Sequence, residues 1–345
     1  MYESNVLELW NLTANGSTVV NSQEILNVVG RLKSPENVQK IFYSLNCGAE
    51  VPIFFNREQR PAGRLSRFGD FNIDTIRLKE LRQENHLRLR VVSRQSGETT
   101  DEVFFKKKSM NGISPEFRLN LNGYRHPEQA GQVIDGKWQM SHHENFGPCL
   151  EIKKEDTGLD RIILFGNHKW TTGYEILARL MVVAWTGYPH NVGIVFKWNP
   201  HLQGDGSILP SQWSTGLAYY YSHCPGLRLR FGVDVYVDDK GIKHGDYVMN
   251  EKTLSFYRRW IGRKVNRILR TEAVYSQVAP LSHYWFRVLV HPKKYALTVW
   301  KVGKKEPKAQ LSVSNPIERL KSGSVGIIAH RCAVRLYEFN VTSVD

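Results

Sequence analysis

Short runs in which apolar and polar residues alternate recur along this chain, and they constrain its fold more than any other feature. In the clearest run, Leu87, Leu89 and Val91 alternate with Arg88 and Arg90. Successive side chains of a strand point to opposite faces, so such a run buries one face and exposes the other. Turn residues separate the runs at intervals of about 10 residues, and helical spacing is nearly absent. The pattern predicts an all-β protein built from antiparallel β-sandwiches.

The first part of the chain predicts a small sandwich of about seven strands. Its candidate strands are 25–32, 38–45, 51–55, 69–76, 86–93 and 102–107. The order of strand and turn residues over 28–32, 38–46 and 69–73 resembles that of bacterial immunoglobulin-like domains. The resemblance implies an N-terminal Ig-like β-sandwich that serves as a spacer or packing partner and has no catalytic role.

A charged stretch that contains a glycine, 106–112, follows this sandwich and predicts a change of domain. The length of 345 residues is typical of about two domains. We therefore expect an N-terminal sandwich over 1–110, a linker over 111–130 and a second domain over 131–345.

The sequence of the second domain predicts longer strands than that of the first, and it contains more aromatic residues. Its candidate strands are 136–140, 150–153, 161–165, 174–184, 192–198, 217–222, 227–237, 284–290, 296–302, 324–329 and 334–341. So many strands in one domain imply two stacked sheets, as in a jelly roll. One inserted basic helix, 251–270, combines an apolar stripe with many Arg and Lys residues. It is expected to cover a sheet edge or a pocket mouth, either as a simple solvated helix or as an attractor of anions.

Five segments of this domain have an order of strand and turn residues that can be compared with known folds. They lie at 173–175, 191–198, 285–288, 323–330 and 338–341. They resemble the concanavalin A-like jelly-roll superfamily, including its laminin G and keto-disaccharide hydrolase-like branches, over most of 130–345. The matching residues are mainly structural, so the resemblance implies a fold directly and a function only by analogy. By that analogy, the concave face of one sheet binds a carbohydrate.

An unbroken alternating run, 227–237, predicts a strand with one polar face. Arg228, Arg230, Asp234 and Tyr236 share that face, and the apolar residues between them share the other. Two cations, a carboxylate and a phenol side by side suit a ligand platform on a concave sheet. The alternative is a solvated convex face on which Arg and Asp pair.

Aromatic residues cluster just before this run. The cluster comprises Trp198, Trp213, Tyr219, Tyr220 and Tyr221, with His201 and His223 beside them. Aromatic faces can stack on the apolar faces of sugar rings, while nearby polar groups supply directed hydrogen bonds. At least one tyrosine of 219–221 must belong to the core, because alternate residues point to opposite faces.

Glu175 and Arg179 share one face of the strand 174–185, together with apolar residues. Glu175 could be an acid tuned by Arg179, or the two could form a simple ion pair. We assign catalysis to Glu175, Asp234, His223 and Tyr221, and ligand contacts to Arg179, Trp198, Trp213, Tyr219, Arg228, Arg230 and Tyr236. The chain lacks a G-x-S-x-G elbow, a phosphate-binding loop and an E-x-D-x-x-E strand, so no established mechanism transfers to it.

The chain carries 47 Lys and Arg residues against 33 Asp and Glu residues, a net charge of +14. This excess favours acidic partners, although it also promotes solubility. The predicted function is the recognition or processing of a carbohydrate ligand, which the charge allows to be anionic. The alternative is an intracellular cyclase, lyase or glycosidase that acts on a small aromatic, terpenoid or sugar substrate. Nucleic-acid binding ranks third, because the sequence contains no recognised module for it.

Cys47, Cys149, Cys224 and Cys332 are widely spaced and form no C-x-x-C motif, which predicts free thiols in a reducing compartment. No segment approaches the ~20 apolar residues of a membrane span. The first residues also lack the basic and apolar blocks of a signal peptide. We therefore expect a cytoplasmic protein without a transmembrane segment, a bound metal or a cofactor.

Overall fold

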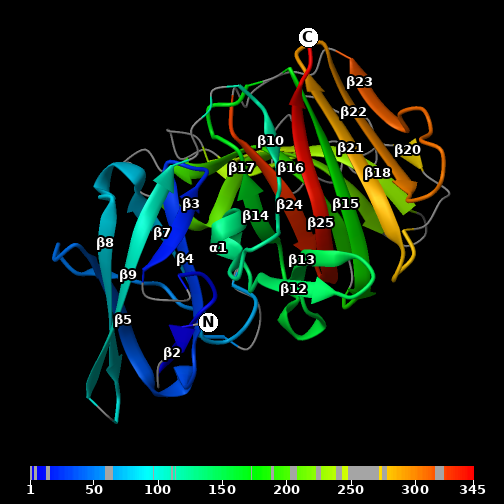
Figure 1. Ribbon diagram of the computed structural model, residues 1–345. Coiled ribbons are helices and arrows are strands. Elements are labelled where there is room, and N and C mark those ends of the chain that lie inside the picture. Colours follow the sequence, from blue (N-terminus) through cyan, green and yellow to red (C-terminus); the bar gives the residue numbers. More distant parts are fainter. Residues whose placement is uncertain are drawn as a thin grey trace.

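The computed structural model describes two β-sandwiches that lie side by side (Figure 1). The described residues are 2–3, 6–12, 16–58, 65–95, 97–109, 112, 114–171, 173–187, 190–202, 208–222, 227–237, 243–247, 272–273, 278–314 and 322–345. At 2–3, 21, 109, 199–202, 208–222, 227–237, 243–247, 272–273 and 313 the structure describes the backbone alone. The basic helix predicted over 251–270 lies outside the described residues. None of the described helices is long and apolar enough to cross a membrane.

The first sandwich consists of two sheets formed by residues 2–109. One sheet has the order β1 (Tyr2–Glu3), β2 (Leu7–Leu9), β4 (Ile25–Leu32) and β7 (Asp70–Arg77). The other has the order β3 (Ser17–Asn21), β9 (Glu98–Ser109), β8 (Glu84–Ser93), β5 (Val38–Leu45) and β6 (Val51–Pro52). The predicted alternation is confirmed in β8, where Leu87, Leu89 and Val91 are buried and Arg88 is exposed. Two 3-10 helices, η1 (Pro35–Asn37) and η2 (Leu78–Glu80), lie in its connections.

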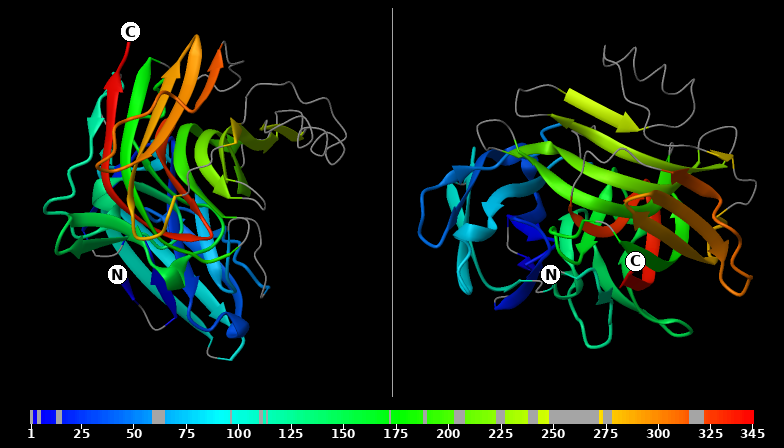
Figure 2. Two further views of the ribbon diagram at one scale, coloured as in Figure 1. Left: turned by 90° about the vertical axis from the view of Figure 1, so that its right-hand side faces the viewer. Right: turned by 90° about the horizontal axis from the view of Figure 1, so that it is seen from above.

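The second sandwich also has two sheets, and it confirms the all-β, jelly-roll prediction for this part of the chain. The first sheet has the order β12 (Gln139–His143), β13 (Gly147–Ile152), β25 (Cys332–Ser343), β15 (Tyr174–Trp185), β21 (His283–His291), β22 (Lys294–Lys301) and β23 (Leu311–Ser314). The second has the order β11 (Gln132–Asp135), β14 (Arg161–Phe165), β24 (Ser324–His330), β16 (His190–Leu202), β17 (Ile208–Ser222), β18 (Leu227–Val237) and β19 (Lys243–Tyr247). The short strand β20 (Glu272–Ala273) pairs with β18. In Figure 2 the orange strands β21 and β22 lie in a different layer from the yellow-green strands β17 and β18.

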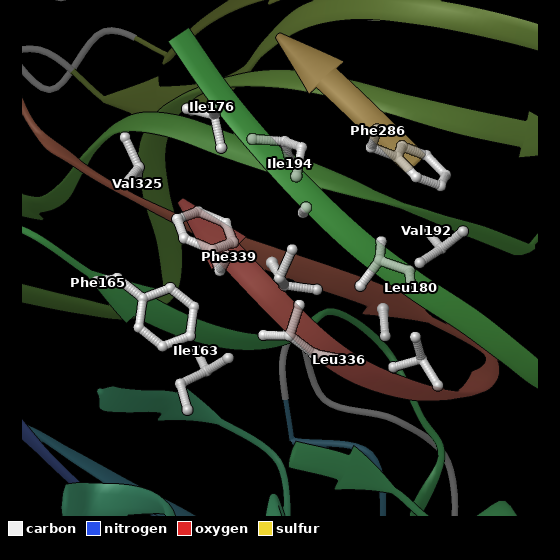
Figure 3. Packing of buried hydrophobic residues seen from close by; sticks show 14 of the residues in the cluster. Ile163, Phe165, Ile176, Leu180, Val192, Ile194, Phe286, Val325, Leu336 and Phe339 are labelled. Carbon is white, nitrogen blue, oxygen red and sulfur yellow. The ribbon is translucent and has the colours of Figure 1, made fainter. Parts of the chain in front are cut away.

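Inward-facing apolar residues of both sheets fill the space between the two layers (Figure 3). Ile176 and Leu180 of β15 and Ile194 of β16 are at most 1% exposed, as alternation along the strands requires. The rings of Phe165 and Phe339 lie 4.6 Å apart in the same core, from opposite sheets. This packing fixes which residues of each strand remain on the outer faces.

The segment 111–130, expected to be a linker, is packed against the second sandwich where the structure describes it. Within it, β10 (Phe117–Arg118) pairs with β25, and Leu119 and Leu121 belong to the core. The short helix α1 (Pro127–Ala130) follows. The segment therefore connects the sandwiches as part of the core and not as a free tether, because its apolar side chains are buried there.

The strand predicted over 136–140 is wrong. Gly136 has φ +86° and ends β11, and a new strand, β12, begins at Gln139. A side chain at position 136 would collide with Arg161, so glycine is required there for space as well as for backbone conformation. Arg161 in turn pairs with Asp135 at 3.4 Å, and both side chains are almost completely buried. A third 3-10 helix, η3 (Lys154–Asp156), lies between β13 and β14.

Buried hydrogen bonds join the two sandwiches. Oε1 of Gln132 accepts the N–H groups of Ser22 (2.9 Å) and Gln23 (3.1 Å), and its Nε2 donates to the carbonyl of Ile25 (2.6 Å). One further bond crosses the junction from Asn72, which donates to the Ile134 carbonyl at 2.8 Å. Buried polar groups cost free energy when they lose their partners, so these bonds favour one fixed arrangement of the two sandwiches.

Candidate functional site

The structure separates the predicted site residues between the two sheets of the second sandwich. Glu175 and Arg179 lie on β15, in the sheet that also contains β21 and β25. The other sheet contains β17, with Trp213, Tyr219 and Tyr221, and β18, with Arg228, Arg230, Asp234 and Tyr236. Glu175 therefore lies in a different sheet from the backbone of β17 and β18.

The backbone of β17 and β18 supports part of the predicted polar row. Their antiparallel register places Tyr219 opposite Arg230 and Tyr221 opposite Arg228. Residues opposite one another in a sheet occupy the same face. The side chains of these strands, and all of His223, lie outside the described residues, so the row stays a prediction.

Trp198 is a core residue and not a ligand contact. Its side chain is 2% exposed and packs in a buried cluster with Ile134, Val195 and Ile328. The Trp198 carbonyl also accepts a hydrogen bond of 2.9 Å from Gln23 of the first sandwich. The prediction was wrong because the aromatic cluster in the sequence contained no information about the strands β11, β14 and β24, whose apolar residues bury this side chain.

The strands β15, β21 and β22 expose polar and aromatic residues on the side away from the core. Alternation buries Ile176 and Phe286, and it leaves Glu175 and Arg287 partly exposed on the opposite side. The same side carries Trp285, opposite Trp300 of β22. We call this surface the outer face and define it by Glu175, Arg179, His283, Trp285, Arg287, Trp300, Glu306, Tyr337 and Glu338.

Arg287 is the centre of the outer face. Its Nε lies 3.5 Å from Oε1 of Glu175, and its Nη2 lies 3.2 Å from Oε2 of Glu306. The guanidinium carbon also lies 5.7 Å from the ring centroid of Trp300, within the range of a cation–π contact. One cation thus positions two carboxylates beside an aromatic ring.

The two tryptophans form a flat aromatic pair next to these charges. The ring centroids of Trp285 and Trp300 are 6.4 Å apart, and their planes differ by 29°. Both residues are partly exposed. Aromatic pairs on adjacent strands stabilise a sheet, and their exposed surface remains free for stacking with a ligand.

The electrostatic surroundings of Glu175 favour its protonated form. Burial raises the pKa of the Glu175 carboxyl, Arg287 acts in the opposite direction, and the charge of Glu306 raises the pKa further. A raised carboxyl pKa is typical of a general acid, although structural carboxylates share it. Arg179 does not take part in this pairing, because its Nε lies 2.8 Å from Oε1 of Glu338 instead. The predicted Glu175–Arg179 pair is therefore replaced by two separate ion pairs.

A second aromatic group adjoins Arg179. The Arg179 guanidinium lies 5.2 Å from the ring centroid of Tyr337, and the ring of His283 lies 4.8 Å from Tyr337 and 4.1 Å from Phe146. Burial lowers the pKa of His283, and the charges of Arg179 and His143 add to this effect. His283 is therefore an uncharged hydrogen-bonding group at neutral pH.

The described residues contain no group of His, Cys, Asp and Glu that could hold a metal ion.

The sequence prediction included Glu175 and Arg179 but missed Trp285, Arg287 and Trp300. The alternation of the strands 284–290 and 296–302 already put Trp285 and Arg287 on one polar face. A hairpin between those strands would also have placed Trp300 opposite Trp285. The contact of Arg287 with Glu175 depends on strand order, which the alternation does not contain.

No family model matches the chain, and no curated protein matches it at a significant level. Among solved structures, a protein of unknown function with a galectin-like fold from Bacillus subtilis is 8% identical, covers 67% of this chain and 96% of its own, and has a TM-score of 0.41. The exoplasmic/lumenal domain of VIP36 in its Ca2+/Man3GlcNAc-bound form is 9% identical, covers 61% and 84%, and has a TM-score of 0.37. The GH43 protein BlXynB mutant from Bacillus licheniformis is 10% identical, covers 96% and 66%, and has a TM-score of 0.32. At such low identities and TM-scores, none of them assigns a ligand or a reaction to this chain.

Proposed function

We propose that the outer face binds a carbohydrate. The observation that carries this proposal is the Trp285–Trp300 pair, flanked by a guanidinium that contacts two carboxylates. A sugar ring has an apolar face that stacks on aromatic rings, and hydroxyl groups at its edge that hydrogen-bond to carboxylates and guanidinium groups. The outer face supplies both kinds of contact within one patch, from β15, β21, β22 and the segment that follows β22.

The test is a titration calorimetry screen of neutral and acidic oligosaccharides, followed by Trp300→Ala. Loss of the stacking surface should cost about 1.4 kcal/mol or more of binding free energy, which corresponds to a tenfold or greater loss of affinity. The matched control is Phe104→Ala, which removes another exposed ring, 48% exposed and on the first sandwich. Equal affinity of the two variants and the unchanged protein would disprove the proposal for this face.

The β17–β18 row is the competing location for the same ligand. It is supported by the register that pairs Tyr219 with Arg230 and Tyr221 with Arg228. The variant Asp234→Asn tests it in the same screen. If Asp234→Asn abolishes sugar binding and Trp300→Ala does not, the ligand lies on that row and not on the outer face.

A carbohydrate-processing enzyme is the second candidate function, and the environment of Glu175 favours it. Burial raises the pKa of this carboxyl, and Glu306 contacts the same guanidinium, so two carboxyl groups in different surroundings lie beside one cation. Glycosidases use such a pair of carboxylates. In any oligosaccharide that the protein both binds and cleaves, Glu175→Gln should abolish cleavage and preserve binding. Unchanged cleavage would leave the carbohydrate-binding function alone.

We also propose that the two sandwiches correspond to an Ig-like domain over 1–110 and a concanavalin A-like domain over 131–345. The support is that residues 2–109 and 117–343 form separate sheets. The first sandwich then acts as a packing partner for the second, as the hydrogen bonds of Gln132 suggest.

A further inference from the structure

A cleft of about 510 Å³ lies where the two sandwiches meet, away from the outer face. From the first sandwich it is lined by the end of β7, by η2 and by β9, which contribute Arg77, Lys79 and Lys107. From the second sandwich it is lined by His168 and Lys169, which follow β14. The volume is within the range of about 300–1,000 Å³ typical of small-molecule sites. We call it the junction cleft.

The lining of the junction cleft is strongly basic. Its four Arg and Lys residues face one carboxylate, that of Glu24. Glu24 lies 3.5 Å from Nε2 of His168, but its side chain is 70% exposed, so water screens much of its charge. Among the described residues, Lys79 and Lys169 have no ion-pair partner. Like charges that converge on one concave surface favour a bound anion, which relieves their repulsion.

The walls of the cleft are fixed before any ligand binds. The His168 N–H donates to the Ser22 carbonyl at 3.0 Å, and the Leu78 N–H donates to the Glu24 carbonyl at 2.6 Å. The Lys107 ammonium donates to the Leu81 carbonyl at 3.3 Å, which holds that charge at the cleft. A rigid site loses less conformational entropy on binding, so the same charges give a higher affinity.

The cleft also has an apolar component. Ile25, which is 3% exposed, and the partly buried Leu78 line it together with the cations. Burial lowers the pKa of His168, against the effect of Glu24, so at neutral pH this ring can donate or accept a hydrogen bond without a charge. The lining therefore suits a molecule that has both an apolar part and more than one negative charge.

We propose that the junction cleft binds a small organic anion that carries phosphate or sulfate ester groups. Ammonium and guanidinium groups bind both kinds of ester through charge-assisted hydrogen bonds. Because the lining comes from both sandwiches, the bound anion stabilises the junction between them. This site is separate from the outer face, and its ligand does not depend on the carbohydrate proposal.

The first experiment is a calorimetric titration of the full chain with inorganic pyrophosphate, before and after the double substitution K79Q/K169Q. The double substitution should weaken binding at least tenfold. The control K40Q/K153Q removes the same charge from two exposed lysines elsewhere and should change affinity less than twofold. Equal losses in the two double variants, or the absence of pyrophosphate binding to the unchanged protein, would overturn the proposal.

The second variant is Glu24→Gln, which removes the one carboxylate that lines the cleft. It should tighten pyrophosphate binding severalfold, a gain that damage to the fold would not produce. Glucose 6-phosphate and glucose 6-sulfate then distinguish the two ester classes, since the better match binds more tightly and raises the unfolding temperature more. If duplex DNA binds instead, with equal sensitivity to both double variants, the charge is a diffuse nucleic-acid surface and the cleft proposal is wrong.

Discussion

The hydrogen bonds of Gln132 should contribute strongly to stability, and the substitution Gln132→Met tests this. The side chain is 1% exposed, and methionine has a similar length and volume. The substitution therefore removes hydrogen bonds without creating a large cavity. It leaves the N–H groups of Ser22 and Gln23 and the carbonyl of Ile25 without their Gln132 partner.

The expected loss follows from those three groups. A buried polar group that loses its partner costs about 1–3 kcal/mol. Even at the low end of this range, the two N–H groups cost about 2 kcal/mol, and the carbonyl raises the total to about 3 kcal/mol. For a cooperative unit of about 150–250 residues, this corresponds to a fall in Tm of roughly 6–12 °C.

Differential scanning calorimetry measures this fall. Gln95→Met is the control, because Gln95 is exposed and its side chain makes no hydrogen bond to the residues that the structure describes. The control should change Tm by no more than about 1–2 °C. Since Gln132 joins the two sandwiches, its loss should also separate their unfolding into two transitions. A single transition with a Tm shift equal to that of Gln95→Met would refute this account of the junction.

Three further predictions concern buried ionisable groups. Asp135→Asn leaves the charge of Arg161 buried without its partner and should destabilise the protein by about 3–5 kcal/mol in urea unfolding; a loss below about 1 kcal/mol would show that water reaches the guanidinium. Burial lowers the pKa of His283 below the ordinary histidine pKa of about 6.5. The stability that the uncharged ring contributes is therefore present above about pH 6.5, and it is lost as the pH falls through the lowered pKa. The fall in unfolding free energy between pH 7.5 and pH 5 should therefore be smaller in His283→Gln, and an unchanged fall would contradict this. Burial raises the pKa of Cys149 to about 11, so iodoacetamide should label it far more slowly than the exposed Cys47, as peptide mass spectrometry would show; equal rates would contradict this assignment.

Local residue patterns, either alternating or continuously apolar, were sufficient to predict many strands. The ranges 25–32, 38–45, 161–165 and 227–237 match β4, β5, β14 and β18 at both ends. In each case turn residues bound the run, so the sequence itself contains the limits of the strand. The pattern fails at 136–140, because Gly136 has a positive φ and lies in the turn between β11 and β12.

The candidate site was less predictable, because its contacts come from strand order. The pattern of its own strand identified Glu175 as a polar residue on one face. Its partner Arg287, however, is more than a hundred residues away in the sequence. Trp198 shows the converse error, since its side chain is buried among apolar residues of neighbouring strands that lie far from it in the sequence. Non-local pairing and domain contact are the two pieces of information that residue patterns lack.

The position of β25 has a consequence for synthesis of the protein. This strand lies between β13 and β15 and also pairs with β10, so it completes the middle of its sheet although it is translated after all of the others. A ribosome-bound chain that ends before residue 332 leaves two unpaired strand edges and an open core. We therefore expect the second sandwich to fold only after this strand has left the exit tunnel, and premature termination there to produce aggregates that chaperones must remove.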